Sequence, residues 1–360
     1  MLQLDHEAPI LLVGGGGVVG RRLAPLLTRF EARPLLIAGR SRERAAATIG
    51  AVQALGGEAS FAALDLAGPV GTWSVAAVIC LVNDPQDKLL LAAVGAGVPF
   101  VDITRWTTRL ASAVARVTLA EARAPVVLAS GWMGGLLPRV AALLAGEIGG
   151  AIDSVDGAVR YALADASGAD SIEYIDRLWI PFDVTLGGRA VTVSPLSEAR
   201  CVSVAGRRTI VRRFDTPEQW SLPLTLGASS VAVRLGFDHA LAGTALAFLS
   251  RIGFFRWFAA ERFRALRHAL LRTKGAEHRS GAPAAFRVDV TNTDGVARGM
   301  SLSTADGQAG LTAVGAWLAA RFALSAATPA GVSFPEQDPD NASLLQLLQR
   351  AGVTAVRGSP

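Results

Sequence analysis

The feature that most constrains this chain is a run of glycines directly after a short apolar segment near the N-terminus. Residues 9–13 are suited to a buried parallel strand, and residues 21–29 follow a helical pattern. Between them, Gly15, Gly17 and Gly20 fit the spacing G-x-G-x-x-G. Such glycines permit a tight turn, let backbone N–H groups approach a pyrophosphate, and let helix and strand pack closely. The turn, with Val18 and Val19, therefore predicts a dinucleotide site, and a flexible surface turn is the alternative.

The residues after the next apolar run indicate which dinucleotide this turn would bind. Residues 34–38 form a second candidate strand at the spacing of a β-α-β unit. An acid about 20 positions after the glycines is typical of NAD sites, whereas Arg accommodates the 2′-phosphate of NADP. Here Arg40, Ser41 and Arg42 occupy that place, and no acid precedes Glu43. The sequence favours NADP (NADPH) as cofactor; the alternative is that both arginines are solvated residues at an ordinary helix start.

Apolar runs and helical segments continue to alternate along the N-terminal part of the chain. Further candidate strands lie at 59–64, 76–82, 98–101 and 126–129, with helical segments that include 87–95 and 109–123. The alternation is typical of the α/β class, a Rossmann doubly wound parallel sheet whose ligands bind beyond the carboxyl ends of the strands. Asp65, Asn83 and Asp102 stand at such ends; we expect Asp65 near the adenine and Asn83 near the nicotinamide. Capping a helix or closing a turn is the competing role for these residue types.

The composition excludes several other classes of protein. With 51% hydrophobic and 18% charged residues among 360, the chain is too apolar for disorder and long enough for two domains. The net charge of +5 is concentrated between residues 251 and 274, where seven cations face one acid, so nucleic acid is not an expected partner. Two cysteines make neither a disulfide framework nor a zinc site, so we expect no metal and a cytoplasmic location. No uncharged run is long enough for a spanning helix.

Several short segments together resemble the saccharopine dehydrogenase-like oxidoreductases. Besides the glycine turn they are residues 97–102, the turn 131–136, Asp306-Gly307-Gln308 and residues 331–336. The resemblance implies a Rossmann domain interrupted by an α+β domain that supports substrate binding and dimer contacts, with C-terminal helices that return to the Rossmann side. It also implies nicotinamide-dependent chemistry on a C–N bond through an imine. Members that act on amino acids commonly carry Asp-Pro-Gly in the turn, where this chain has Met133-Gly134-Gly135, a departure from that substrate class.

The middle of the chain agrees with an inserted α+β domain. Short β-favouring runs lie at 155–163, 190–193, 209–214, 286–290 and 297–302, before a helical segment at 310–324. We place the Rossmann domain at 1–134, the α+β domain at 135–305 and the returning C-terminal helices at 306–360.

Elimination narrows the chemistry that the chain can perform. Lysine occurs only at 88 and 274 and tyrosine only at 161 and 174, so a Tyr-x-x-x-Lys pair is impossible, and metalloprotease and serine-hydrolase motifs are also missing. Hydride transfer remains, in which the cofactor performs the difficult step and the protein supplies orientation and a proton donor. The candidate donors are Asp102, Tyr161 or Tyr174, and His239, although a lone histidine that opens a helix is more often a structural residue.

Two residues are candidates for substrate contact, and one segment has no role in this scheme. Arg105, just past Asp102, is suited to a substrate carboxylate, and Trp132 lies in the turn 131–136. Residues 251–274 form a basic helical pattern with aromatic residues opposite some of the arginines. Such a helix can contact a membrane interface, cap a pocket for an apolar substrate, or pack on its own domain or across a dimer.

We therefore expect an NADP-dependent oxidoreductase, a cytoplasmic homodimer, that transfers a hydride between nicotinamide and a C=N or C=O bond of a small metabolite. Two alternatives stay open. One is an oxidoreductase that acts on a lipid-like substrate at a membrane surface, and the other is an NADP-binding sensor without turnover.

Overall fold

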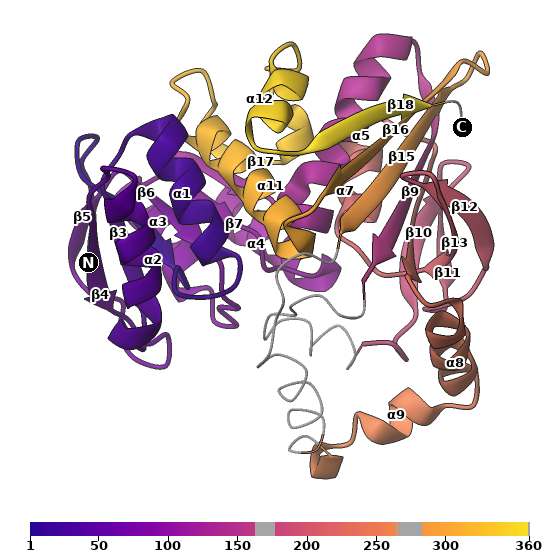
Figure 1. The fold of residues 1–360 in the computed structure, drawn as a ribbon, viewed down its shortest axis with the longest axis horizontal. Coiled ribbons are helices and arrows are strands. Elements are labelled where there is room, and N and C mark those ends of the chain that lie inside the picture. The colour runs from indigo at the N-terminus through magenta and orange to yellow at the C-terminus, as the bar shows by residue number, and fades with distance from the viewer. Residues whose placement is uncertain (163–176, 264–265, 267–282, 359–360) are drawn as a thin grey trace. The chain divides into compact units, whose positions relative to one another are not determined.

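The computed structural model describes residues 1–162, 177–263, 266 and 283–358 (Figure 1). It contains two compact units, Met1–Leu136 with Thr312–Pro339, and Leu137–Leu311 with Asp340–Pro360. Residues 306–311 and 340–360 thus belong to the second unit, whereas the expected division assigned all of 306–360 to the Rossmann side. The reason is strand pairing, because β18 (Thr354–Gly358) runs antiparallel to β16 (Ala297–Thr304) in the second unit.

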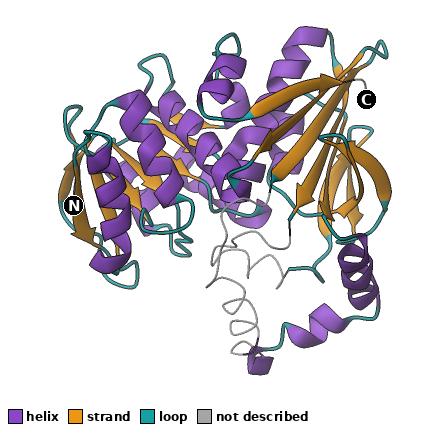
Figure 2. Cartoon of the chain, viewed as in Figure 1, coloured by secondary structure: helices purple, strands orange, loops and turns teal. Residues whose placement is uncertain are grey.

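The first unit is built on a seven-stranded sheet in which all neighbouring strands are parallel, in the order β17-β8-β7-β6-β2-β3-β4. Helices cover both faces of this sheet (Figure 2). Its strands are β2 (Ile10–Val13), β3 (Leu35–Gly39), β4 (Ala59–Ala63), β6 (Ala77–Cys80), β7 (Phe100–Asp102), β8 (Pro125–Leu128) and β17 (Gly331–Ser333). Its helices are α1 (Gly20–Glu31), α2 (Arg42–Ala54), α3 (Lys88–Ala96) and α4 (Thr107–Leu119), and β1 (Leu2–Leu4) pairs separately with β5 (Trp73–Val75).

Continuous apolar runs explain why these strands occupy the centre of the unit. Ile10, Leu11 and Leu12 in β2 have no exposed surface, as expected for a strand covered on both faces. The strand order reverses direction beside β2, which has β3 on one side and β6 on the other. Such a switch point opens a crevice at the carboxyl ends of the strands, where doubly wound folds bind their ligands. The predicted fold class is confirmed, and it puts the glycine turn at the carboxyl end of β2, at this switch point.

The second unit contains a mixed seven-stranded sheet in the order β12-β13-β14-β9-β15-β16-β18, with only β14 and β9 parallel. Its remaining elements are β9 (Ile152–Tyr161), β10 (Phe182–Leu186), β11 (Arg189–Val193), β12 (Arg200–Val204), β13 (Arg207–Arg213), α7 (Glu218–Thr225), β14 (Ser230–Phe237), β15 (Ala284–Asn292) and α12 (Leu344–Arg350). Two helices pass from one unit to the other, α5 (Trp132–Ile148) and α11 (Gly307–Leu324). A β-carbon on Gly157 of β9 would lie 3.0 Å from Leu137, so α5 packs tightly on this sheet.

The basic stretch does not form the single helix that its pattern predicts. Instead α8 (Ala240–Arg251) ends before Gly253, whose φ of 77° is left-handed, and the short α9 (Phe254–Phe258) and a 3-10 turn (Glu261–Phe263) follow. A glycine in that conformation ends a helix because its backbone turns at little steric cost. Residues 264–265 and 267–274 of the stretch lie outside the described residues. In the part of the chain that the structure describes, no helix is long and apolar enough to cross a membrane.

Candidate dinucleotide and active site

The glycine turn joins β2 to α1 and is fixed by close backbone contacts. Gly14, one residue before the predicted motif, has a φ of 83°, so the left-handed turn occurs there. A β-carbon on Gly20 would lie 2.4 Å from the carbonyl oxygen of Gly15, far inside contact distance. On Gly17 it would lie 3.1 Å from the oxygen of Gly14. The glycines therefore let α1 begin directly against the turn, as the spacing predicts.

Side chains hold the carbonyl groups of this turn on its inner side. The hydroxyl of Thr48 in α2 donates to the oxygen of Gly15 at 3.0 Å, and Arg22 Nη1 donates to the oxygen of Val18 at 3.2 Å. In a planar trans peptide, the N–H of the next residue points away from the carbonyl. The N–H groups of Gly16 and Val19, which follow these carbonyl groups, therefore point away from Thr48 and Arg22.

The donors left over fit a pyrophosphate. The N–H groups of Gly16, Val18 and Val19 donate no hydrogen bond to any residue that the structure describes. They stand at the N-terminus of α1, whose first turn contains no acid. Unpaired donors and the positive end of a helix dipole together form an anion site. The residues here fit the phosphates of a dinucleotide.

The residues expected at the 2′-phosphate stand where β3 ends and α2 begins. Ser41 is the N-cap of α2, and its Oγ accepts a hydrogen bond from the N–H of Arg44 at 3.2 Å. Ser41 therefore caps the helix, and its hydroxyl can still donate a hydrogen bond to a second acceptor. Arg40 is exposed, and the guanidinium of Arg42 lies 4.8 Å from the ring centre of Phe61 in β4. Two arginines thus flank the N-cap of α2 at the end of β3.

Asp65 is exposed after β4 and closes a turn. Its Oδ1 accepts from the N–H of Ala67 at 3.1 Å. The following backbone is anchored by Lys88 of α3, whose Nζ donates to the carbonyl oxygens of Leu66 at 2.7 Å and of Gly68 at 3.0 Å. The structural role considered for Asp65 is therefore present, on a loop fixed to α3.

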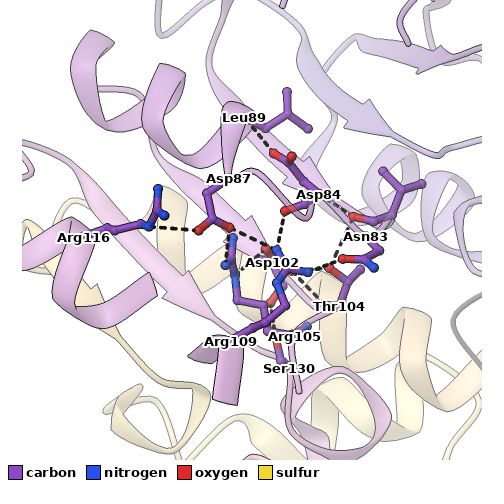
Figure 3. Close-up of polar contacts among 12 residues, drawn as sticks. Asn83, Asp84, Asp87, Leu89, Asp102, Thr104, Arg105, Arg109, Arg116 and Ser130 are labelled. Atoms are coloured by element: carbon purple, nitrogen blue, oxygen red, sulfur yellow. Dashed lines mark hydrogen bonds and ion pairs between the residues drawn. The ribbon is translucent and has the colours of Figure 1, made fainter. Parts of the chain in front are cut away.

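A buried network of charges lies at the carboxyl ends of β6 and β7 (Figure 3). Its centre is Asp87, 4% exposed, which has a φ of 58°. Its Oδ1 pairs with Arg105 Nη1 at 2.6 Å and with Arg109 Nη2 at 3.1 Å, and its Oδ2 lies 3.4 Å from Arg116 Nε. One carboxylate thus faces three guanidiniums, an arrangement that neutralises charges which would be costly to bury alone.

Asp102 completes this network and is fully engaged in it. Its Oδ2 accepts from Arg105 Nε at 2.8 Å, while its Oδ1 accepts from the N–H and the hydroxyl of Thr104, each at 2.8 Å. Burial alone would lower the pKa of Arg105, but Asp102 and Asp87 hold that pKa above its ordinary value. Asp102 and Arg105 are each 1% exposed. Each is thus a buried ion-pair partner of the other, and the roles expected from the sequence, proton donor for Asp102 and substrate partner for Arg105, stay predictions.

Asn83 and Asp84, directly after β6, link the network to α3. The Asn83 side-chain oxygen accepts from Arg109, and so does the backbone oxygen of Asp84. The Asp84 carboxylate accepts from the N–H of Leu89 at 2.8 Å in the first turn of α3. Asn83 therefore follows the carboxyl end of β6 with its side chain held by Arg109, whereas the Asp84 carboxylate binds the first turn of α3.

The turn at 131–136 has an unusual backbone. Met133, Gly134 and Gly135 all have positive φ, at 57°, 66° and 82°. A β-carbon on Gly315 of α11 would lie 2.1 Å from the oxygen of Met133, so α11 crosses the turn in direct backbone contact. Trp132, half-buried, opens this turn. The apolar Met133 is 4% exposed and takes the place of the aspartate that the resemblance leads one to expect.

The other candidate donors belong to the second unit or lie outside the description. Tyr174 is among the residues outside the described ranges. Tyr161 ends β9, with its ring centre 6.0 Å from that of Phe237. His239 is exposed and is the N-cap residue of α8, the position expected for Asp238, and its side chain makes no capping hydrogen bond.

Sequence analysis missed Asp87, Arg109 and Arg116. A weak signal was available, because Arg105, Arg109 and Arg116 are spaced four and seven residues apart and so share one side of a helical segment. Only the fold reveals the carboxylate that they share.

The sheet order and the glycine turn define the first unit as a Rossmann-type dinucleotide-binding fold. The whole chain is similar to saccharopine dehydrogenase (L-Glu forming) from Saccharomyces cerevisiae, with 12% identity, a TM-score of 0.64, and 98% of this chain and 100% of that one covered. The chain therefore has a saccharopine dehydrogenase-like fold, in agreement with the resemblance seen in the sequence.

Two other solved structures overlay more loosely. An amine dehydrogenase from Mycobacterium smegmatis has 13% identity, a TM-score of 0.47, and 93% and 98% of the two chains covered. A myo-inositol dehydrogenase from Corynebacterium glutamicum has 12% identity, a TM-score of 0.40, and 100% of both chains covered. No protein-family model and no curated protein matches the sequence.

Proposed function

We propose that this protein is an NADP-dependent oxidoreductase that transfers a hydride between the nicotinamide and a C=N or C=O bond of a small metabolite. The observation that carries the proposal is the glycine turn with its unpaired N–H groups at Gly16, Val18 and Val19. Such donors, at a helix N-terminus and beside a close-packed glycine turn, are suited to bind phosphates. When bound, the cofactor supplies the hydride chemistry.

Selection of NADP over NAD is assigned to the corner formed by Arg40, Ser41 and Arg42. Both guanidiniums can form charge-assisted bonds to a 2′-phosphate, and neither has an acidic partner among the described residues. No acid occupies the position that would bind a ribose 2′-hydroxyl.

The chain's own residues orient and shield the reacting groups. Asn83, which is held by Arg109, would border the nicotinamide. The buried ion pairs of Asp87, Asp102 and Arg105 fix the ends of β6 and β7. A rigid, dry wall of this kind keeps the reacting atoms positioned, which contributes more to hydride transfer than added flexibility. The apolar turn at Met133 favours a substrate other than an amino acid.

Titration with NADPH and NADH tests the proposal, with energy transfer from tryptophan to the reduced nicotinamide as the readout. We expect NADPH to bind more tightly. In the double variant Arg40→Ala/Arg42→Ala the Kd for NADPH should rise by at least about tenfold, the value of one charge-assisted bond, while the Kd for NADH stays the same. The control is Arg29→Ala, an equally exposed arginine in the last turn of α1. Tighter binding of NADH, or no binding of either, would refute the proposal.

A further inference from the structure

The outer side of α8 is apolar, the reverse of what a surface helix normally shows. Leu241 is 85% exposed, Phe248 62% and Ile252, just after the helix, 61%. At about 100° per residue these three positions fall within roughly 40° of one another, so they form one stripe along the helix. A solvent-facing stripe on a helix of a globular protein ordinarily carries polar residues.

The opposite side of α8 attaches the helix to its own unit. Ser250 donates a hydrogen bond to the carbonyl oxygen of Leu178 at 3.1 Å, and a β-carbon on Gly243 would lie 3.4 Å from the Phe237 ring at the end of β14. Ser250 and Gly243 stand about 180° from the Leu241–Phe248 stripe on the helical wheel. The apolar stripe therefore faces away from the residues through which α8 is attached to its own unit.

The apolar surface continues into α9 as an aromatic cluster. Trp257 is 50% exposed, and the rings of Phe254 and Phe258 stack with centres 5.2 Å apart. Arg262 lies over the Trp257 ring at 5.7 Å and over the Phe263 ring at 4.8 Å. Tryptophan together with arginine is the combination that residues at the boundary between lipid headgroups and acyl chains commonly show.

The charge around this surface has a single sign over a long stretch. No acid occurs from Ala240 to Ala260, whereas Arg251 and Arg256 are exposed there. Neither arginine has an acidic partner among the described residues. Exposed apolar residues flanked by cations complement an anionic membrane surface better than they complement a protein surface, where arginines would need fixed acidic partners.

We propose that α8 and α9 form a membrane-docking surface: the stripe of Leu241, Phe248 and Ile252 enters the interface of an anionic bilayer, with Trp257 beside it and Arg251 and Arg256 at the lipid headgroups. Each arginine near such a surface strengthens binding about fivefold, and each large apolar side chain that enters the interface on the order of tenfold. The surface goes beyond the proposed function and stands independently of the cofactor site, because all its residues belong to the second unit.

Vesicle co-sedimentation of the full chain tests this surface. We expect binding to vesicles of phosphatidylcholine mixed with phosphatidylglycerol, weaker binding to phosphatidylcholine alone, and a loss of binding as salt is raised. Phe248→Glu and Ile252→Glu should each weaken binding at least tenfold. The matched control is Leu224→Glu in α7 of the same unit, where the leucine is 65% exposed, and this variant should bind as the unchanged protein does.

Two further measurements keep the outcome unambiguous. Circular dichroism and NADPH titration of the Phe248→Glu and Ile252→Glu variants should give the same results as for the unchanged protein, because both side chains are already exposed to solvent. These two measurements separate a failure of the membrane-docking proposal from a failure of the proposed function. No binding to anionic vesicles, or equal binding by Phe248→Glu, overturns the proposal. A stripe that serves instead as an interface between proteins would show itself as a change in sedimentation mass in Phe248→Glu without vesicle binding, which also overturns it.

Discussion

Replacing Gly20 by alanine tests whether the close approach of α1 to the glycine turn is what makes the dinucleotide site. The new β-carbon would lie 2.4 Å from the oxygen of Gly15 and 2.5 Å from its α-carbon, where about 3.5 Å is comfortable. The turn must therefore move by about 1 Å. Hydrogen bonds of about 2.9 Å from its N–H groups to a phosphate would lengthen beyond the useful range. Losing two such charge-assisted bonds costs about 3–6 kcal/mol, so the Kd for NADPH should rise at least about 100-fold.

Binding is measured by energy transfer or calorimetry, and folding by thermal unfolding. The control is Gly50→Ala in α2, where an added β-carbon meets no atom within 4 Å. That variant should bind NADPH normally. Its free energy of unfolding should rise by about 0.5–1 kcal/mol, because alanine is more stable than glycine in a helix interior. If Gly20→Ala bound NADPH as tightly as the unchanged protein, the assignment of the phosphates to this turn would be wrong.

Three further predictions concern the buried ion-pair network, the two cysteine thiols and the ion pair of Glu147 with Arg357. Asp87→Asn keeps a residue type that tolerates the left-handed backbone but leaves buried guanidiniums without their shared carboxylate, so urea unfolding should show a loss of about 3–5 kcal/mol. Ellman's reagent should titrate one thiol in the native protein, the exposed Cys201, since burial raises the pKa of Cys80 and shields it; two native thiols would contradict this. The hydrogen bond from Arg357 lowers the pKa of Glu147 below its ordinary 4.5, so this pair stabilises the fold at neutral pH and is lost as pH falls through the lowered value. Thermal unfolding of Glu147→Gln across the acidic range should depend less on pH.

The core of the first unit could be predicted from the sequence because its strands are buried on both faces. A short, continuous apolar run such as residues 76–82 is typical of a strand that is covered on both faces, and β6 lies within this run. The strand at Thr354–Gly358 could not be found in this way. All five of its residues are exposed, so it has neither an apolar run nor an alternation, and its place depends on the free edge of β16.

The candidate site was predictable only where it is local in the chain. The glycine turn is specified by residues a few positions apart, so its spacing alone carries the information. The ion-pair network is not specified locally. Asp87 follows β6 and Arg105 follows β7, so the two side chains meet only when these strands pair. A strand-end aspartate such as Asp102 looks the same in sequence whether it faces a ligand or a buried arginine.

The chain passes from the first unit to the second, returns to the first at Thr312 and enters the second again at Asp340, and this order affects how the protein folds during synthesis. The sheet of the first unit receives its edge strand β17 only after the whole of the second unit's insertion has been made, and the second sheet receives β18 after that. Until then β8 and β16 keep unpaired edges, which are open to association with other chains. The first sheet therefore cannot be complete before Gly331–Ser333 has been made, nor the second before Thr354–Gly358. Contacts of such long sequence separation form slowly, and chaperone dependence in the cell is the expected result.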